Sequence, residues 1–484
     1  MLHAGWRTRA AGAAAFALPL LLYYRTAAPT VYGVDSAELT TGAYLLGIVH
    51  PPGSPAYLLI GHLFTRLPFG DVGFRVNLLS VTAAAASCLL LFHIARHLTG
   101  QRAIALLISL VGAVTYYAWT SAVAAELYAL HGCVMLALIA LGLRWRATGE
   151  PVGFTCACGL EGFALGVHLA AVLLLPGVAL LLLLPPRPTR ASPPLLLGAL
   201  AFLAGASVYA YVPLRHLAAL PLNPARDYWQ IDLASWSGFW WMVSGGGFRE
   251  LFFAVPMSEM PEAFFELARG VWSNFLGVGA LFGMVGLVRG LRQAPEIHLS
   301  LLVMVIGHLV FFLGYGAADK EVMNLPVLLI WAIWIAVGAT AVGGWLNARM
   351  PGAGGWLVIQ VGLGSLALLL LLINRPWVDL SQDRSARARG EAILGALAPD
   401  AVLVGSWSDL RVVEYLQHVE GRRLDVQPVD AFFSGTAERG RRIGAALATG
   451  RPVYVSTCRD LPDAQLQCER IAGCDCFRLR RPAS

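Results

Sequence analysis

Long apolar runs alternate with short polar connections along most of the chain. A helix needs about 20 consecutive apolar residues to cross a bilayer, and runs near this length recur as far as residue 374. We therefore predict an α-helical polytopic membrane protein with about 11 transmembrane helices. The predicted spans are residues 10–28, 76–95, 103–119, 128–143, 153–167, 169–185, 194–212, 271–288, 298–314, 325–345 and 356–374.

The pattern changes after Pro376. Strand-like "AVLVGSW", "RLDVQPVD" and "RPVYVST" alternate with helix-like "SDLRVVEYLQHVEG" and "RRIGAALATG", which predicts a small α/β domain. Residues 377–484 also hold 29 of the 64 charged residues. We predict two domains, a membrane domain over residues 1–376 and a soluble domain over residues 377–484.

Composition supports the membrane assignment and removes one class of partner. The chain is 57% hydrophobic and 13% charged, whereas soluble domains carry about 25% charged residues. Lys320 is the only lysine. Without a lysine-rich patch, we expect no nucleic-acid partner.

Basic and acidic residues fall on opposite sides of the predicted spans. Arginines occupy alternate short connections, which the positive-inside rule assigns to the cytoplasm. We therefore expect a multi-pass protein of a bacterial-type inner (plasma) membrane, with its site and its C-terminal domain extracytoplasmic. The first apolar run resembles a cleaved signal peptide, but we expect it to remain as an anchor.

Cysteines in the C-terminal stretch fit an oxidising compartment. We expect a Cys458–Cys468 disulfide. A zinc site on the "CDC" at Cys474 and Cys476 is the alternative, although its spacing differs from the usual two to four intervening residues.

The stretch "YGVDSAELTTGAYLLGIVHPPGSPAY" concentrates polar groups just after the first predicted span. Asp35 and Glu38 are three residues apart and share one face of a helix. A carboxylate beside an apolar wall is suited to general-base catalysis. The alternative is a helix start, with Asp35 as N-cap and Glu38 in a capping box. His50 lies in a rigid Pro-Pro-Gly turn, which is either a binding loop or a solvated turn.

Further polar residues occur at the outer ends of later spans. Glu126, Tyr128 and His131 begin the fourth span in "AAELYALH", and His168 lies near the end of "GLEGFALGVH". Ionisable groups at bilayer depth usually face a cavity or a partner. Tyrosine at an interface is common and indicates little alone. Glu161 lies deeper, and we expect a structural hydrogen-bonding group there.

The predicted outer segment 213–270 supplies arginine and tryptophan. Arg215 and Arg249 are candidate phosphate ligands. Trp240 belongs to an aromatic cluster that suits either a sugar ring or the lipid–water interface. The "SGGG" lacks the spacing of a nucleotide phosphate loop. Asp319 and Lys320 open the tenth span, as site residues or as a paired surface cluster.

These motifs together resemble a family of GT-C glycosyltransferases. "GVDSAELTTGAYLLGIVHPPGSPAY", "AELYALH", "GVHLAAVLLLP", "YVPLR", "NP", "FWWMVSGGGFR" and "DKEVMNLP" occur in the family's order over most of residues 10–330. The family, formerly a domain of unknown function, includes the eukaryotic transmembrane O-mannosyltransferase acting on IPT ectodomains. It takes sugar from a polyprenyl-phosphate carrier.

The resemblance implies a catalytic base and a set of binding residues. Asp35 matches the base on the first outer loop, with Glu38 as second candidate. The remaining matches, taken with the motif residues above, give a substrate- and phosphate-binding set of His50, Glu126, Tyr128, His131, His168, Arg215, Asn223, Trp240, Arg249, Asp319 and Lys320. The sequence departs from the family after Asn223, where "NPARDYWQ" replaces a Trp-Gly-Asp-type stretch, so no role is carried over to Asp227 or Trp229.

The implied reaction is a single displacement that inverts the anomeric carbon. Asp35 would deprotonate an acceptor hydroxyl, and arginine or histidine would stabilise the leaving polyprenyl phosphate. The acceptor is a protein Ser or Thr, a glycan or a lipid, and mannose is the family's best-known sugar. We expect no metal, with a divalent cation as the alternative. A lipid or glycan transporter (flippase) and a ligase of lipid-linked glycans are the alternative functions.

Overall fold

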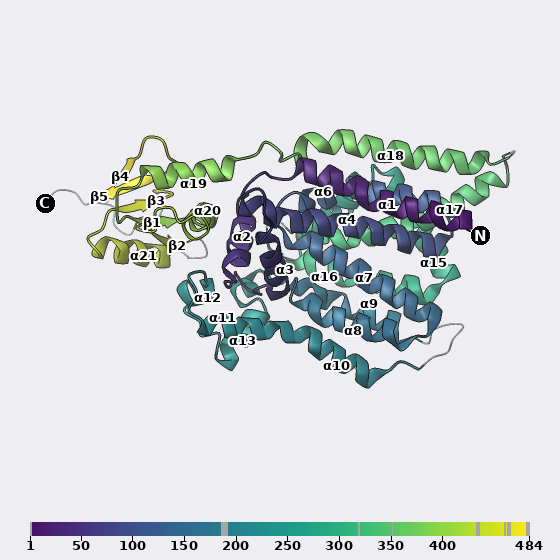
Figure 1. The fold of residues 1–484 in the computed structure, drawn as a ribbon, viewed down its shortest axis with the longest axis horizontal. Coiled ribbons are helices and arrows are strands. Elements are labelled where there is room, and N and C mark those ends of the chain that lie inside the picture. The colour runs from purple at the N-terminus through teal and green to yellow at the C-terminus, as the bar shows by residue number, and fades with distance from the viewer. Residues whose placement is uncertain are drawn as a thin grey trace.

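In the computed structural model a helical bundle carries a small α/β domain at one end (Figure 1). The structure describes residues 2–184, 192–317, 320–350, 352–431, 436–458, 461 and 466–480. The bundle and its connections comprise α1 (Leu2–Thr26), α2 (Asp35–Leu45), α3 (Pro55–Thr65), α4 (Val72–Thr99), α5 (Arg102–Ala113), α6 (Tyr116–Ala122), α7 (Leu127–Thr148), α8 (Pro151–Leu165), η1 (Leu169–Leu173), α9 (Leu175–Leu183), α10 (Leu195–Ala206), η2 (Ser207–Ala210), α11 (Tyr211–Leu217), α12 (Pro224–Asp227), α13 (Trp236–Val243), η3 (Gly246–Leu251), α14 (Met260–Asn274), α15 (Val278–Gln293), α16 (Pro295–Gly314), η4 (Val322–Asn324), α17 (Leu325–Asn347) and α18 (Gly354–Val378).

Each of the predicted spans falls on one to three of these helices, and residues 194–212 cover α10, η2 and the start of α11. Within the described residues, six helices are long and apolar enough to cross a membrane, and counting two bent helix pairs as spans raises this number to eight. The bent pairs are α5 with α6, at 67°, and α14 with α15, at 104°. The fold is therefore that of a polytopic helical membrane protein.

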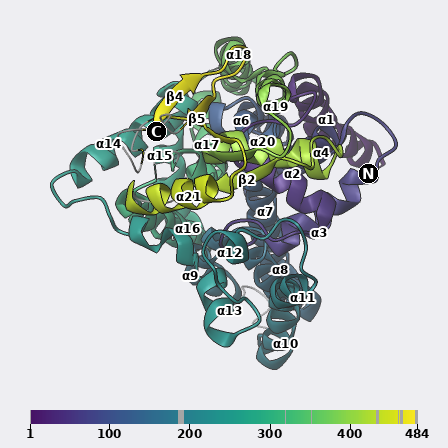
Figure 2. The same ribbon diagram turned by 90° about the vertical axis from the view of Figure 1, so that its left-hand side faces the viewer.

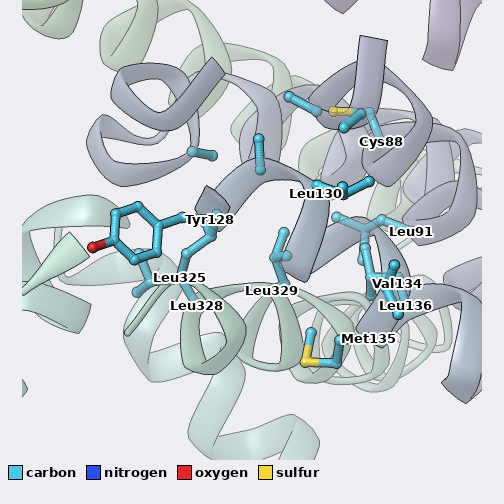
Figure 3. Packing of buried hydrophobic residues seen from close by; sticks show 14 of the residues in the cluster. Cys88, Leu91, Tyr128, Leu130, Val134, Met135, Leu136, Leu325, Leu328 and Leu329 are labelled. Carbon is cyan, nitrogen blue, oxygen red and sulfur yellow. The ribbon is translucent and has the colours of Figure 1, made fainter. Parts of the chain in front are cut away.

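Aliphatic side chains fill the space between α4, α7 and α17. Figure 3 shows Leu325 of α17 next to Tyr128 of α7, with Leu329 one turn further along α17, and all three are buried. Glycine allows the helices to approach this closely: a Cβ at Gly132 would lie 2.8 Å from Leu329 Cδ1. Close packing of this kind holds α7 rigidly, and its first residues help to line the site described below.

The C-terminal domain comprises α19 (Ser385–Ala396), β1 (Val402–Gly405), α20 (Trp407–His418), β2 (Gln427–Asp430), α21 (Thr436–Ala448), β3 (Val453–Val455), β4 (Gln467–Arg470) and β5 (Phe477–Arg480). Its sheet has the order β2-β1-β3-β5-β4. β1 pairs in parallel with β2 and β3, as expected of strands joined by helices, whereas β5 is antiparallel to β3 and β4.

Disulfides close the last part of this domain. The expected Cys458–Cys468 disulfide is confirmed. Cys474 and Cys476 form a second disulfide. The alternative of a zinc site on these two residues is therefore wrong, because a disulfide leaves no thiolate to bind a metal.

The C-terminal domain packs directly on the bundle through α20. Figure 2 shows α20 lying over α2, and one buried apolar cluster joins Val31 and Ala37 of the bundle to Leu410 and Val413 of α20. The Tyr415 hydroxyl also accepts a hydrogen bond from the Gly73 backbone N–H at 3.2 Å. The N-terminus of α2 is consequently enclosed by both domains.

Candidate active site

Asp35 is the first residue of α2. Val34 precedes it as N-cap with no side-chain capping bond. The helix therefore does start here, but the alternative interpretation of Asp35 as N-cap with Glu38 in a capping box is wrong. The Asp35 Oδ1 instead accepts a hydrogen bond from Trp407 Nε1 at 3.0 Å. The positive end of the helix dipole favours a carboxylate at this position.

Glu38, one turn further along α2, is fully buried and binds His50. Its Oε1 accepts from the His50 backbone N–H at 3.0 Å, and its Oε2 contacts the His50 Nδ1. Burial alone would lower the pKa of His50, but the Glu38 and Asp35 carboxylates outweigh it and raise the pKa to about 9. His50 is therefore a cation at neutral pH.

A cavity of about 820 Å³ opens beside Asp35 and His50. Glu126 and His168 complete its polar end, and most of the remaining wall is apolar. This apolar wall includes Leu127, Leu169, Val172, Leu173, Phe248, Leu251, Phe252, Phe311, Phe312 and Met323. A cavity with one charged end and a long apolar wall suits an amphiphile with a charged head group.

The histidines predicted from the later spans meet at this cavity. His168, the residue before η1, lines the cavity together with Tyr128. Their ring centroids are 5.6 Å apart. His131 is buried behind His168, at 5.3 Å between ring centroids. Neither His131 ring nitrogen has a hydrogen-bond partner among the described residues. The structure thus brings Tyr128 and His168 to the cavity and leaves His131 one layer behind it.

Arg249 lies at the cavity's edge. Its Nη2 donates to the Ser244 hydroxyl at 2.5 Å, and Ser244 lines the cavity. The Arg249 side chain is exposed. The ring of Phe248, the residue before it, packs edge-on against His50 at 5.5 Å. η3 therefore holds a guanidinium at the opening and an aromatic wall next to His50.

Arg215 and Asn223 do not line this cavity. Arg215 Nε donates to the Leu46 carbonyl at 2.7 Å, at the C-terminal end of α2. The Asn223 Oδ1 accepts from the Arg226 backbone N–H at 3.2 Å and caps α12. In the structure both residues support backbone segments that flank the site.

Trp240 and Lys320 also lie away from the cavity. Trp240 is 48% exposed and packs against Trp236 on α13, an arrangement typical of the lipid–water interface. Lys320 donates to the Tyr315 carbonyl at 2.8 Å and lines a separate cavity of about 320 Å³. Asp319 lies outside the described residues.

Sequence reasoning missed Trp407 and Arg411 of the C-terminal domain. Trp407 is 3% exposed and lines the cavity beside Asp35. Arg411 stacks on the Trp407 ring, with 4.3 Å between Cζ and the ring centroid. One signal was available: Trp407 comes two residues after β1, and ligands of open α/β sheets gather at the carboxyl ends of strands.

Asp35, Glu38 and His50 also each present one ligand atom, and these atoms lie within 4.8 Å of one another. Carboxylate and imidazole together suit several divalent cations. A metal ligand must be deprotonated, so a cation bound here would displace the proton of the His50–Glu38 pair. The trio is therefore suited to hold either a proton in an ion pair or a divalent cation.

The raised pKa of His50 predicts how stability depends on pH. The folded pKa of about 9 lies above the value of about 6.5 for an unfolded histidine. Protonation therefore favours folding, so this contribution is complete below pH ~6.5 and is lost as pH rises through about 9. Thermal unfolding of wild type and His50→Gln between pH 6 and 10 checks this. The gap in Tm should shrink with rising pH, and a constant gap would contradict the assignment.

Comparison with known sequences relates part of the chain to one protein family. Residues 35–191 match the family described as the protein O-mannosyl-transferase TMEM260 N-terminal domain. The chain is 31% identical over 235 residues to the protein O-mannosyl-transferase TMEM260 of Mus musculus. That alignment covers 46% of this chain and 33% of the mouse protein, so the chain matches only about a third of the length of its curated relative.

Solved structures extend the likeness of fold to the whole chain. ArnT from Cupriavidus metallidurans bound to undecaprenyl phosphate has a TM-score of 0.58 at 13% identity, covering 98% of both chains. ArnT in the apo state has a TM-score of 0.59 at 14% identity, covering 99% of this chain and 98% of that one. The predicted GT-C-like fold is confirmed. The chain therefore shares the GT-C-like fold of ArnT, and its residues 35–191 match the family of the TMEM260 N-terminal domain.

Proposed function

We propose that this protein is an inverting glycosyltransferase that moves a sugar from a polyprenyl-phosphate carrier to an acceptor hydroxyl. The observation that carries the proposal is the cavity, in which Asp35 and His50 form a polar end on an otherwise largely apolar wall. A prenyl chain matches the apolar wall, and a sugar phosphate matches the polar end. The matched relatives support it, since one is an O-mannosyl-transferase and ArnT was crystallised with undecaprenyl phosphate.

The residues divide the chemistry between them. Asp35 takes the proton of the acceptor hydroxyl as its oxygen attacks the anomeric carbon. The bond from that carbon to the phosphate oxygen breaks, and polyprenyl phosphate leaves with the electron pair. The His50 cation, and Arg249 at the opening, stabilise the negative charge that grows on the phosphate. One displacement on one face of the sugar inverts its configuration.

The reaction is proposed to occur on the extracytoplasmic side. Arginines occupy the opposite side of the predicted spans, and disulfides such as Cys458–Cys468 form in oxidising compartments. A lipid-linked donor also explains why the polar end of the cavity lies at the end of the bundle rather than in its middle. We propose mannose as the sugar and a protein Ser or Thr as the acceptor, by analogy with the mouse relative.

Purified full-length protein in lipid nanodiscs tests the proposal. It is incubated with polyprenyl-phosphate mannose labelled in the sugar and with a peptide rich in Ser and Thr, and a second arm contains EDTA. We expect labelled peptide and an equal amount of polyprenyl phosphate, at the same rate with EDTA. NMR of the product should show the inverted anomer.

Three results would contradict this expectation. Absence of transfer from a panel of polyprenyl-phosphate sugars would exclude the donor class. Movement of intact labelled lipid across a vesicle bilayer without cleavage would favour a transporter. Loss of activity in EDTA that Mn²⁺ restores would overturn the metal-free mechanism.

A further inference from the structure

We propose that Trp407 is a positioning residue for Asp35, so that the C-terminal domain forms part of the catalytic centre instead of covering it. This inference rests on the proposed function, in which Asp35 is the base. Its direct evidence is the hydrogen bond from Trp407 Nε1 to Asp35 Oδ1, at 3.0 Å, between residues of two different domains.

Two further side chains, those of His50 and Arg411, contact the Trp407 ring. The His50 ring packs edge-on against it, with 5.6 Å between centroids. The Arg411 guanidinium lies over the indole at 4.3 Å from the ring centroid. The side chain is 3% exposed, and these contacts favour the orientation in which its N–H points to Asp35.

Arg411 links this arrangement to the sheet and to α2. Its side chain is 3% exposed and forms ion pairs with Asp430 at 2.9 Å and Glu414 at 3.0 Å. Its Nη1 also lies 3.9 Å from Glu38 Oε1. A buried cation close to carboxylates of both domains favours one docked geometry, because separating the domains would remove the attraction between Arg411 and Glu38.

Docking is reinforced at a second point on the same interface. Arg387 of α19 pairs with Glu420 at 2.6 Å and lies 3.7 Å from Asp71, the N-cap of α4. The C-terminal domain thus contacts the bundle through ionic groups at two points, Glu38 of α2 and Asp71 before α4. Such anchoring sets the indole N–H in place before any substrate binds, and this preorganisation is what a positioning residue needs.

The hydrogen bond from Trp407 determines which oxygen of Asp35 is available as the base. An indole N–H is a donor only, so it cannot take the proton from Asp35 or compete with it as a base. By holding Oδ1, it leaves Oδ2 as the oxygen that receives the acceptor's proton. Without the bond, the carboxylate rotates among orientations, and only some of them point a lone pair at the acceptor.

The test compares Trp407→Phe with Trp145→Phe in full-length protein. Both remove one buried indole hydrogen bond, since Trp145 Nε1 donates to the Leu182 carbonyl at 2.9 Å, far from the cavity. We expect Trp407→Phe to lower kcat for sugar transfer about 10- to 100-fold with KM for the polyprenyl-phosphate sugar unchanged. Trp145→Phe should leave kcat unchanged. In an Asp35→Asn background, Trp407→Phe should cause no further loss.

A stability cycle separates failure of this inference from failure of the proposed function. Tm is measured for Trp407→Phe, Asp35→Ala and the double variant, and it needs no enzymatic activity. We expect the double variant to lose less Tm than the sum of the two single losses. Additive losses, or wild-type kcat in Trp407→Phe, would overturn the inference. If the wild type transferred no sugar but the Tm losses were non-additive, the proposed function would be wrong and the contact between Trp407 and Asp35 would still be supported.

Discussion

Asp35→Asn is expected to reduce sugar transfer about 10²- to 10⁴-fold, the usual contribution of a general base. The amide keeps the shape of the carboxylate and an oxygen that accepts from Trp407 Nε1. It cannot take a proton from the acceptor hydroxyl. The measurement is the initial rate of labelled-sugar transfer from the polyprenyl-phosphate carrier, with Tm recorded for the same preparation.

Asp383→Asn is the matched control. The Asp383 Oδ1 accepts from the Ser385 backbone N–H at 2.8 Å at the start of α19, and asparagine keeps this acceptor. Asp383 does not line the cavity. We therefore expect wild-type rates from Asp383→Asn. If Asp35→Asn transferred sugar at near the wild-type rate, or if both variants lost activity equally, Asp35 would not be the base.

Glu38→Gln should have the largest effect on stability. Glu38 is fully buried and holds the His50 ring, while the Arg411 guanidinium lies 3.9 Å away. Removing one partner of a buried ion pair leaves an uncompensated charge and costs about 3–5 kcal/mol of unfolding free energy. Activity should fall as well, because the His50 turn loses the carboxylate that orients it next to Asp35.

Glu150→Gln provides the comparison for this variant. Glu150 pairs with Arg144 at 2.9 Å, and both side chains are more than half exposed. Exposed pairs contribute at most about 1 kcal/mol, so the change in unfolding free energy should be small. Denaturation of both variants in the same detergent measures the difference. Similar losses in the two would show that Glu38 has no special role in holding the site together.

Hydropathy was sufficient to find the long apolar helices of the bundle, but not the shorter α3, α12 and α13, nor how the helices bend or pack. Every predicted span lies on a helix because a bilayer-length apolar run has few other stable structures in lipid. The bends between α5 and α6 and between α14 and α15 have no signal in apolar length. The alternation after Pro376 likewise predicted β1, α20, β2 and β3, whereas the antiparallel β4 and β5 were not anticipated.

The local motifs were sufficient to place Asp35, Glu38 and His50 together. They lie within 16 residues of one another, and helix periodicity with a tight turn brings them into contact. The roles of Arg215 and Arg249 were harder to predict, since a guanidinium binds a phosphate and a backbone carbonyl equally well. Arg215 reaches the Leu46 carbonyl, while Arg249 lies at the cavity's edge. Nothing in their sequence neighbourhoods distinguishes the two.

The amino-acid sequence alone determined the class of the protein, its two-part organisation and the first carboxylate motif, because these depend on composition and on neighbours close along the chain. Only the tertiary structure decided that Trp407 reaches Asp35 across 372 positions. That contact requires α20 to pack on α2, and this packing depends on the shape and charge of the two surfaces that meet. The place of Trp407 just after β1 is a local signal for a ligand site, but no local pattern records which surface of the bundle α20 packs on, so the contact with Asp35 could not be predicted.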